Sequence, residues 1–336
     1  MSKLLKCLNK KDISCVPVWF MRQAGRYLPE FKQIRSKNQN FLKLCFNSNL
    51  ASELTMQPMK RFNLDAAIIF SDILVVPHAL QQQIEFREKK GPWNKNLNID
   101  KFLETKENDF LLTLNPVYEA IKKTKQTLKK DKSLIAFVGA PWTLMVYLYN
   151  LKEQKSSSGK INIENKKEIK LVLKKLDEFL KIHIIHQKEA GAEIIQIFDS
   201  WAGLIEEGEL DEYCFDPNKS LVKFCRENDI PSICFPKGLK NKYQDFIERV
   251  KPTAISIDQE VDPAWAKHNL KGVCIQGGMN PKLLLQSEKV ALEETERYLD
   301  IFKNKPYIFN LGHGILPETN PDIVKKIVDR VSLIKR

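Results

Sequence analysis

Short apolar runs, rich in β-branched and aromatic residues, recur along the whole chain and limit its possible folds most strongly. Such near-continuous apolar character is typical of strands buried on both faces of a sheet. Segments with helical periodicity, such as 169–190 and 239–250, separate the runs. Eight alternations of strand and helix predict an α/β fold, a single (β/α)8 barrel of the TIM type with insertions. We expect one barrel domain over residues 1–336, with the repeats running from about residue 16 to 335. The predicted strands are 16–21, 66–73, 134–138, 193–198, 232–235, 254–257, 273–276 and 307–311.

Polar and conformationally special residues gather where these runs end. In a TIM-type barrel the carboxyl ends of the strands build the active site. A doubly wound open sheet is the main alternative, but no GxGxxG follows the first run and no GxxxxGK[ST] occurs, so nothing supports nucleotide binding. The residues at these ends are Arg22, Asp72, Gly139 to Thr143, Asp199, Ser200, Lys237, Asp258, Gln276 to Gly278, and Gly312 to Gly314.

Composition narrows the class of function. Lys and Arg exceed Asp and Glu by 12, which suits an acidic partner such as a polyanionic metabolite, a nucleic acid or a membrane surface. The excess lies mostly in short lysine clusters typical of solvated helix faces, so nucleic-acid binding is not expected. Seven scattered cysteines without a CxxC pair argue against a disulfide framework or a zinc ribbon. No apolar run is long enough for a membrane helix and residues 1–14 form no signal peptide, so we expect a cytoplasmic protein without membrane contact.

Residues 17–31 read Pro-Val-Trp-Phe-Met-Arg-Gln-Ala-Gly-Arg-Tyr-Leu-Pro-Glu-Phe. If this segment is helical, Arg22 and Arg26 point the same way, with roughly 5 to 6 Å between their Cβ atoms. Each guanidinium can grip a carboxylate through two parallel hydrogen bonds, which a lysine cannot reproduce. The segment resembles the N-terminal signature of the uroporphyrinogen decarboxylase family at nearly every position.

Further matches to this family extend over almost the whole chain. Residues 70–74 resemble the segment that bears its active-site aspartate, here Asp72, and residues 139–147 the segment that bears its tyrosine, here Tyr147. Residues 198–203 resemble its phenylalanine and serine site, here Phe198 and Ser200, and residues 310–314 its histidine turn, here His313. The resemblance implies a homodimer with facing clefts, a tetrapyrrole substrate, and neither a metal nor an organic cofactor. It implies catalytic roles for Arg22, Arg26, Asp72 and Tyr147, which also bind substrate together with Phe198, Ser200 and His313.

The family's reaction explains why these residue types are needed. Uroporphyrinogen carries four acetates and four propionates around four pyrrole N–H groups, which one carboxylate, Asp72, can accept together. Protonation of a pyrrole carbon creates a cationic sink for the electrons released with carbon dioxide. An ionised aspartate about 4 Å from that cation contributes roughly 4 kcal/mol, about a thousandfold in rate. The resemblance places Arg22 and Arg26 on outer carboxylates, and Ser200 and His313 on propionates. The proton donor stays open.

Each of these residues also has an ordinary structural interpretation. Asp72 and Ser200 can cap helices, Tyr147 can belong to the core, and His313 can hydrogen-bond within its turn. His183 and His186 lie three apart on a predicted helix, but no third ligand accompanies them, so packing or exposure is expected rather than a metal.

One segment departs from the family pattern. Residues 276–281 read Gln-Gly-Gly-Met-Asn-Pro, whereas the family usually has Gln-Gly-Asn-Leu-Asp-Pro. The missing aspartate at Asn280 puts any role of this loop in doubt.

Two other functions compete with a decarboxylase. Corrinoid-dependent methyltransferases of the same superfamily bind zinc through an HxC element and a later cysteine. This chain has no HxC, and His313 stands where the thiolate would be expected. The second competitor is a nucleic-acid-binding protein, which predicts a duplex affinity that falls steeply with salt.

Overall fold

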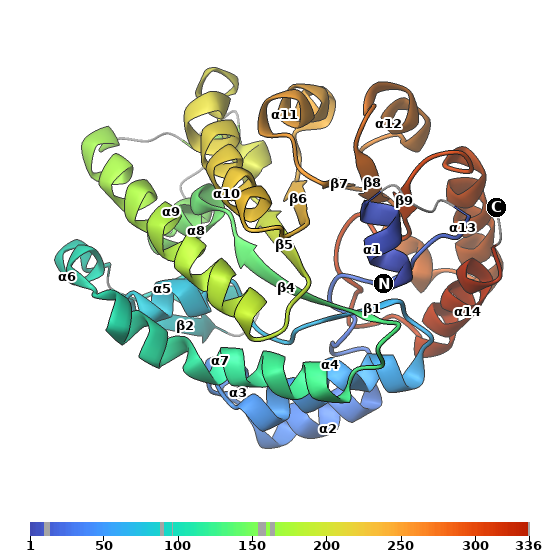
Figure 1. The fold of residues 1–336 in the computed structure, drawn as a ribbon, viewed down its shortest axis with the longest axis horizontal. Coiled ribbons are helices and arrows are strands. Elements are labelled where there is room, and N and C mark those ends of the chain that lie inside the picture. The colour runs from blue at the N-terminus through green and yellow to red at the C-terminus, as the bar shows by residue number, and fades with distance from the viewer. Residues whose placement is uncertain (10–13, 88–90, 96, 154–158, 162–164, 335–336) are drawn as a thin grey trace.

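Seven parallel strands form one curled sheet, with helices around its outside (Figure 1). The computed structural model describes residues 1–9, 14–87, 91–95, 97–153, 159–161 and 165–334. The sheet has the order β1-β4-β5-β6-β7-β8-β9, so its neighbours follow one another along the chain, as a barrel requires. Its strands are β1 (Ala66–Ile68), β4 (Ser133–Gly139), β5 (Ile194–Asp199), β6 (Ser232–Pro236), β7 (Ala254–Ile257), β8 (Cys274–Gly277) and β9 (Tyr307–Ile308).

The eighth position of the barrel is filled by residues 16–21, which bridge the sheet without forming a regular strand. Val18 forms a parallel bridge with Phe309, and its carbonyl accepts the Asp65 N–H at 2.8 Å on the other side. Two features prevent a regular ladder here, because Pro17 has no N–H to donate and the Val18 N–H is taken by Asp65 Oδ2 at 3.0 Å. The TIM-type barrel is therefore confirmed, while the prediction of a regular first strand is wrong.

The helices cover the outer face of the sheet, and two of them match the segments whose helical periodicity predicts a helix. The predicted helix at 169–190 is α9, and most of the predicted helix at 239–250 is α11. Within the described part of the chain, every helix is too short or too polar to span a bilayer. The helices are α1 (Lys3–Leu8), α2 (Pro29–Lys37), α3 (Phe41–Cys45), α4 (Ser48–Arg61), α5 (Val75–Ala79), α6 (Ile99–Glu104), α7 (Glu107–Thr127), α8 (Pro141–Leu148), α9 (Lys166–Glu189), α10 (Asp216–Glu227), α11 (Tyr243–Val250), α12 (Pro263–Asn269), α13 (Glu288–Ile301) and α14 (Pro321–Ser332).

Two elements lie outside the predicted alternation of strands and helices. One is the antiparallel hairpin of β2 (Ile84–Arg87) and β3 (Gly91–Asn94), which lies after α5. The other is α1, whose Leu4, Cys7 and Leu8 pack against inward-facing residues of the barrel strands. A helix this short carries too few residues for a clear periodic signal.

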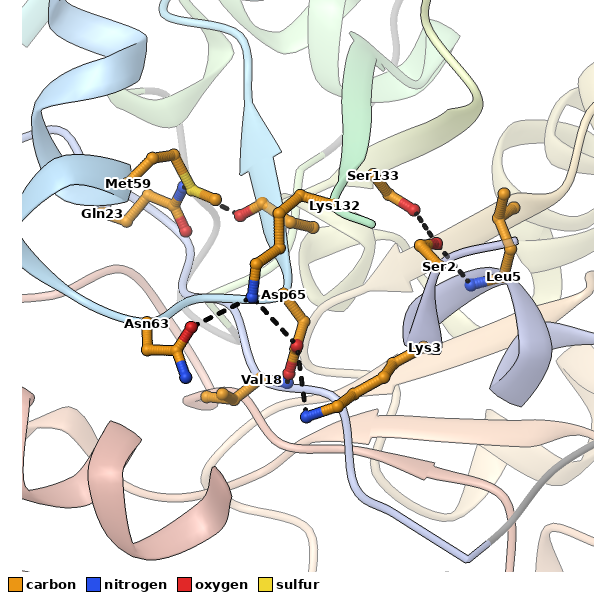
Figure 2. A network of polar contacts seen from close by, with 11 residues as sticks. Ser2, Lys3, Leu5, Val18, Gln23, Met59, Asn63, Asp65, Lys132 and Ser133 are labelled. Carbon is orange, nitrogen blue, oxygen red and sulfur yellow. Dashed lines mark hydrogen bonds and ion pairs between the residues drawn. The ribbon is translucent and has the colours of Figure 1, made fainter. Parts of the chain in front are cut away.

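Polar contacts fasten α1 at the amino-terminal end of the barrel (Figure 2). The carboxylate of Asp65 lies 3.5 Å from the Nζ atoms of both Lys3 and Lys132, and the hydroxyls of Ser2 and Ser133 share a hydrogen bond. This carboxylate therefore ties α1, the irregular first segment and the start of β4 together. Helix α1 closes the amino-terminal end of the barrel, so the active site is expected at the opposite end, where the strands have their carboxyl ends.

The barrel interior is packed rather than hollow. A buried polar layer crosses it, in which Gln276 Nε2 donates to Gln196 Oε1 at 3.1 Å and Gln276 Oε1 accepts the Trp19 indole N–H at 2.9 Å. Above this layer, toward the carboxyl ends of the strands, Phe198 meets Phe137 and Phe235 edge-on, with ring centroids 5.6 and 6.3 Å apart. These three rings make an apolar floor at the mouth of the barrel.

Candidate active site at the barrel mouth

The segment after the first barrel position forms a tight turn that presents Arg22. Residues 21–28 are turns and bends, and α2 begins only at Pro29. Arg22 has a left-handed backbone, with φ of 59°, an uncommon conformation for a residue with a side chain. The buried Gln23 holds the turn, because its Nε2 donates to the Ala66 carbonyl at 3.1 Å and its Oε1 accepts the Phe20 N–H at 3.1 Å. The helical premise for Arg22 and Arg26 is therefore wrong.

Arg22 is the residue that connects the rest of the site. Its side chain lies against Gly314, where an added Cβ would come within 2.6 Å of Arg22 Cγ. Its positive charge acts on the Asp72 carboxyl, the Tyr147 hydroxyl and the His313 imidazole. Arg26 is exposed in the same turn, and within the described residues no interaction links it to the other predicted site residues.

Asp72 follows β1 and is partly buried. Its Oδ1 accepts the Leu74 N–H at 2.8 Å, which ties down the turn before α5, while Oδ2 accepts no hydrogen bond from any residue that the structure describes. Burial raises the pKa of Asp72 to about 6, opposed by the Leu74 N–H and by the charge of Arg22. Asp72 therefore caps the turn before α5 with Oδ1, and its Oδ2 can still accept a hydrogen bond from a ligand.

Tyr147 lies near the end of α8 with its ring against Trp201, at 6.1 Å between centroids. Burial raises the pKa of its hydroxyl, the Trp201 side chain opposes this shift, and the charge of Asp72 adds to it. The hydroxyl is therefore protonated at neutral pH and within electrostatic reach of the Asp72 carboxylate. The ring of Tyr147 therefore packs in the core, as the structural interpretation predicts. Its hydroxyl lies close enough to Asp72 to feel the charge of that carboxylate.

The end of β5 carries Phe198 and Ser200, with Asp199 between them. Phe198 belongs to the floor of the mouth, and the half-buried Ser200 hydroxyl makes no hydrogen bond within the described chain, so Ser200 caps no helix. Asp199 faces the other way and is fully buried, accepting from Thr143 Oγ1 at 2.7 Å and from Asn218 Nδ2 at 2.9 Å. Thr143 Oγ1 also accepts the Trp201 N–H at 3.2 Å. Asp199 thus fastens α8 to the loop behind Tyr147.

His313 is half-buried in the loop after β9. Its Nδ1 accepts the Gly314 N–H at 2.7 Å, so the proton of the neutral ring lies on Nε2, which can donate to a ligand. Burial lowers the pKa of His313 to about 4, and the charges of Arg22 and Lys237 act in the same direction. The hydrogen bond within the turn is confirmed, and it leaves the second nitrogen available.

The sequence places Lys237 at a strand end but indicates no role for it. It follows β6 directly, is half-buried, and its charge reaches His313. Its place after an apolar run is the sequence feature that could have indicated a site. From sequence alone, however, a lysine that faces a binding site looks the same as a lysine exposed to solvent.

The structure explains two of the residues at which the loop 276–281 differs from the family pattern. Asn280 Oδ1 accepts the Lys282 N–H at 3.0 Å, so the amide caps the turn that follows, as an aspartate would. Gly278 has φ of 105°, and a Cβ there would come within 2.9 Å of the Tyr298 ring. A side chain at this position would require its neighbours to move.

The histidine pair on α9 serves packing. His183 is buried, with its Nδ1 3.0 Å from the Tyr118 hydroxyl, and burial lowers its pKa to about 3. His186 lies 3.2 Å from a carboxylate oxygen of Glu189. Among the residues that the structure describes, no three His, Cys, Asp or Glu side chains group closely enough to hold a metal ion.

The fold and the mouth residues define a class of protein: a TIM-type barrel enzyme whose active site surrounds one carboxylate with cationic side chains. The model of the family "Uroporphyrinogen decarboxylase (URO-D)" matches residues 1–333. The uroporphyrinogen decarboxylase of Rickettsia felis is 41% identical over 331 residues, covering 96% of this chain and 95% of that protein. That of Rickettsia bellii is 43% identical over 334 residues, covering 97% and 96%. The chain belongs to the uroporphyrinogen decarboxylase family.

Among solved structures, a methyltransferase from Methanosarcina mazei has the same fold. It superposes with a TM-score of 0.76 and 16% sequence identity, covering 98% of this chain and 96% of that one. A B12-independent methionine synthase from Shewanella superposes with a TM-score of 0.52 and 11% identity, covering 86% and 87%. At such low identities these likenesses describe the fold alone.

Proposed function

We propose that this chain decarboxylates the four acetate side chains of uroporphyrinogen III to methyl groups, giving coproporphyrinogen III and carbon dioxide for haem synthesis. Family membership supports the reaction. The single observation that carries it to these residues is the Asp72 carboxylate, which keeps one oxygen without a hydrogen bond among the described residues and lies within the electrostatic reach of Arg22 and Tyr147. The reaction class is a carboxy-lyase that needs no metal or organic cofactor.

Asp72 Oδ2 accepts the pyrrole N–H groups at the centre of the macrocycle, and the apolar floor at Phe198 supports one face of the ring. With a pKa of about 6, Asp72 is roughly nine-tenths ionised at pH 7. A proton added to a pyrrole carbon makes the ring cationic beside this anion. The bond to the carboxyl carbon then breaks, its electron pair neutralises the ring, and carbon dioxide leaves. A second proton on the exocyclic carbon and loss of the ring proton give the methyl group.

The remaining side chains bind the rim of the substrate. Tyr147 donates a hydrogen bond to the acetate that reacts, because its hydroxyl stays protonated near Asp72. Arg22 and Arg26 hold outer carboxylates, Arg22 close to the reacting centre and Arg26 at the exposed edge of the turn. Ser200 and His313 face propionates, with His313 donating from Nε2.

Anaerobic incubation of the purified protein with uroporphyrinogen III tests the proposal, because coproporphyrinogen III must appear. Failure to form it under conditions where a known decarboxylase works would refute the activity. Stoichiometric zinc together with methyl transfer to a thiol would instead favour the methyltransferase alternative. A duplex mobility shift that survives moderate salt would favour nucleic-acid binding.

Three wider features belong to the same proposal. Residues 1–336 act as one domain, since β1 and the strands β4 to β9 share one sheet. The protein works in the cytoplasm as a homodimer, as the family resemblance implies. Light scattering on the purified protein tests the dimer, and a monomer mass at micromolar concentration would contradict it.

A further inference from the structure

Lys237 at the barrel mouth differs from the nearby Lys242 in having no acidic partner among the described residues. Lys242, five residues after Lys237, pairs with Glu207 at 2.8 Å and lies 3.6 Å from Asp245. Lys237, by contrast, forms no ion pair with any residue that the structure describes, although it is half-buried. A half-buried ammonium without a counter-ion loses hydration without compensation, so its place favours an anionic ligand.

The backbone of Lys237 is held on both sides. Its N–H is shared between the carbonyls of Asp199 and Phe235, both at 3.1 Å, and its carbonyl accepts the Gly203 N–H at 2.9 Å. The next N–H, of Gly238, donates to Asp258 Oδ2 at 2.7 Å. These hydrogen bonds fix the backbone of Lys237 at the end of β6. Only its side chain is free to change conformation when a ligand binds.

Strand β6 brings Lys237 to the mouth of the barrel. Ile233 and Phe235 of β6 belong to the barrel-interior cluster, and side chains two residues apart on a strand share a face. Lys237 is the first residue after β6, at the carboxyl end of this inward-facing strand, and its charge lowers the pKa of His313 in the loop after β9. Arg22 acts on the same histidine from the first barrel segment, so three positively charged or hydrogen-bond-donating groups converge from three separate elements.

We propose that Lys237 binds one propionate carboxylate of the macrocycle together with His313. This inference rests on the proposed function and adds a specificity-determining residue to it. The choice between propionate and acetate follows from the reaction. A cation paired with the reacting acetate would stabilise a charge that is lost as carbon dioxide forms, and so would slow the step. Lys237 therefore suits an arm that keeps its carboxylate throughout.

Steady-state kinetics of Lys237→Met and Lys237→Arg test this, with Lys130→Met as the matched control. Lys130 is an exposed lysine before β4, at the opposite end of the barrel, so its loss changes net charge equally. For Lys237→Met we expect KM for uroporphyrinogen III to rise about 10- to 100-fold with kcat within about threefold, the signature of lost uniform binding. Lys237→Arg should retain most of the affinity, and Lys130→Met should behave as wild type.

Product inhibition identifies the arm. Coproporphyrinogen III has lost every acetate but keeps all propionates, so its inhibition constant should weaken by the same factor as KM in Lys237→Met. An unchanged KM overturns the proposal, and a raised KM with an unchanged product inhibition constant overturns the propionate assignment. Equal thermal unfolding of the three variants and wild type shows that folding is intact. If wild type itself produced no coproporphyrinogen, the proposed function would fail first, which separates the two failures.

Discussion

Asp72→Asn separates the catalytic role of this residue from its effect on stability, because the two change in opposite directions. The asparagine oxygen can still accept the Leu74 N–H, so the turn before α5 keeps its hydrogen bond. What the substitution removes is a partly buried negative charge whose pKa is raised by burial from an ordinary value of 3.8 to about 6.

The sign follows from proton binding. Between pH 4 and 6 the folded state holds a proton on Asp72 that the unfolded state has released, so the free energy of unfolding of wild type falls as pH rises. Above pH 6 the penalty levels off, at up to about 3 kcal/mol for a shift from 3.8 to about 6. We therefore expect Asp72→Asn to be more stable than wild type at pH 7.5 by up to this amount, with a difference that shrinks toward pH 4.

Turnover should change in the other direction. Loss of an anion beside a cationic transition state costs about 4 kcal/mol, roughly a thousandfold in kcat. In wild type, kcat/KM should rise with pH through about 6 as Asp72 ionises.

Urea unfolding of wild type and Asp72→Asn at pH values from 4 to 8, with anaerobic turnover at pH 7.5, provides both measurements. Asp131→Asn, at an exposed aspartate before β4, serves as the control. Equal stability of Asp72→Asn and wild type at every pH would refute the burial argument, and near-normal kcat would remove Asp72 from the centre of the reaction.

The remaining predictions concern the neighbours of Asp72. Arg22→Lys keeps the charge but loses the planar fork, so kcat/KM should fall about 10- to 100-fold; an unchanged value would contradict bidentate recognition. Gly314→Ala places a methyl group within 2.6 Å of Arg22 Cγ and should lower kcat/KM by displacing that side chain, whereas Gly208→Ala, which meets nothing within 4 Å, should not. Equal activity of the two alanine variants would show that the position of Arg22 is not critical. EDTA should leave turnover unchanged, and time-dependent inactivation would point to a required metal.

Much of the barrel was predictable because a strand buried on both faces is apolar at nearly every position, and this pattern is visible in the sequence. The runs at 134–138, 193–198 and 254–257 are apolar at nearly every position, and they form strands β4, β5 and β7 almost as predicted. The run at 16–21 is equally apolar, yet Pro17 and the Asp65 carboxylate replace its ladder hydrogen bonds. Because Asp65 lies 47 residues after Val18, the local sequence around 16–21 does not reveal this contact.

The sequence by itself determined which residue types stand at the ends of the strands, and family resemblance selected Arg22, Asp72, Tyr147 and His313 among them. Only the tertiary structure decided that Arg22 adopts a left-handed turn rather than a helix and lies against Gly314. It also decided that α1 closes the far end of the barrel and that Lys237 lies near His313 without an acidic partner among the described residues. The physical reason is that burial is encoded by neighbouring positions in the chain. Charge pairing depends instead on which distant segments closure of the barrel brings together.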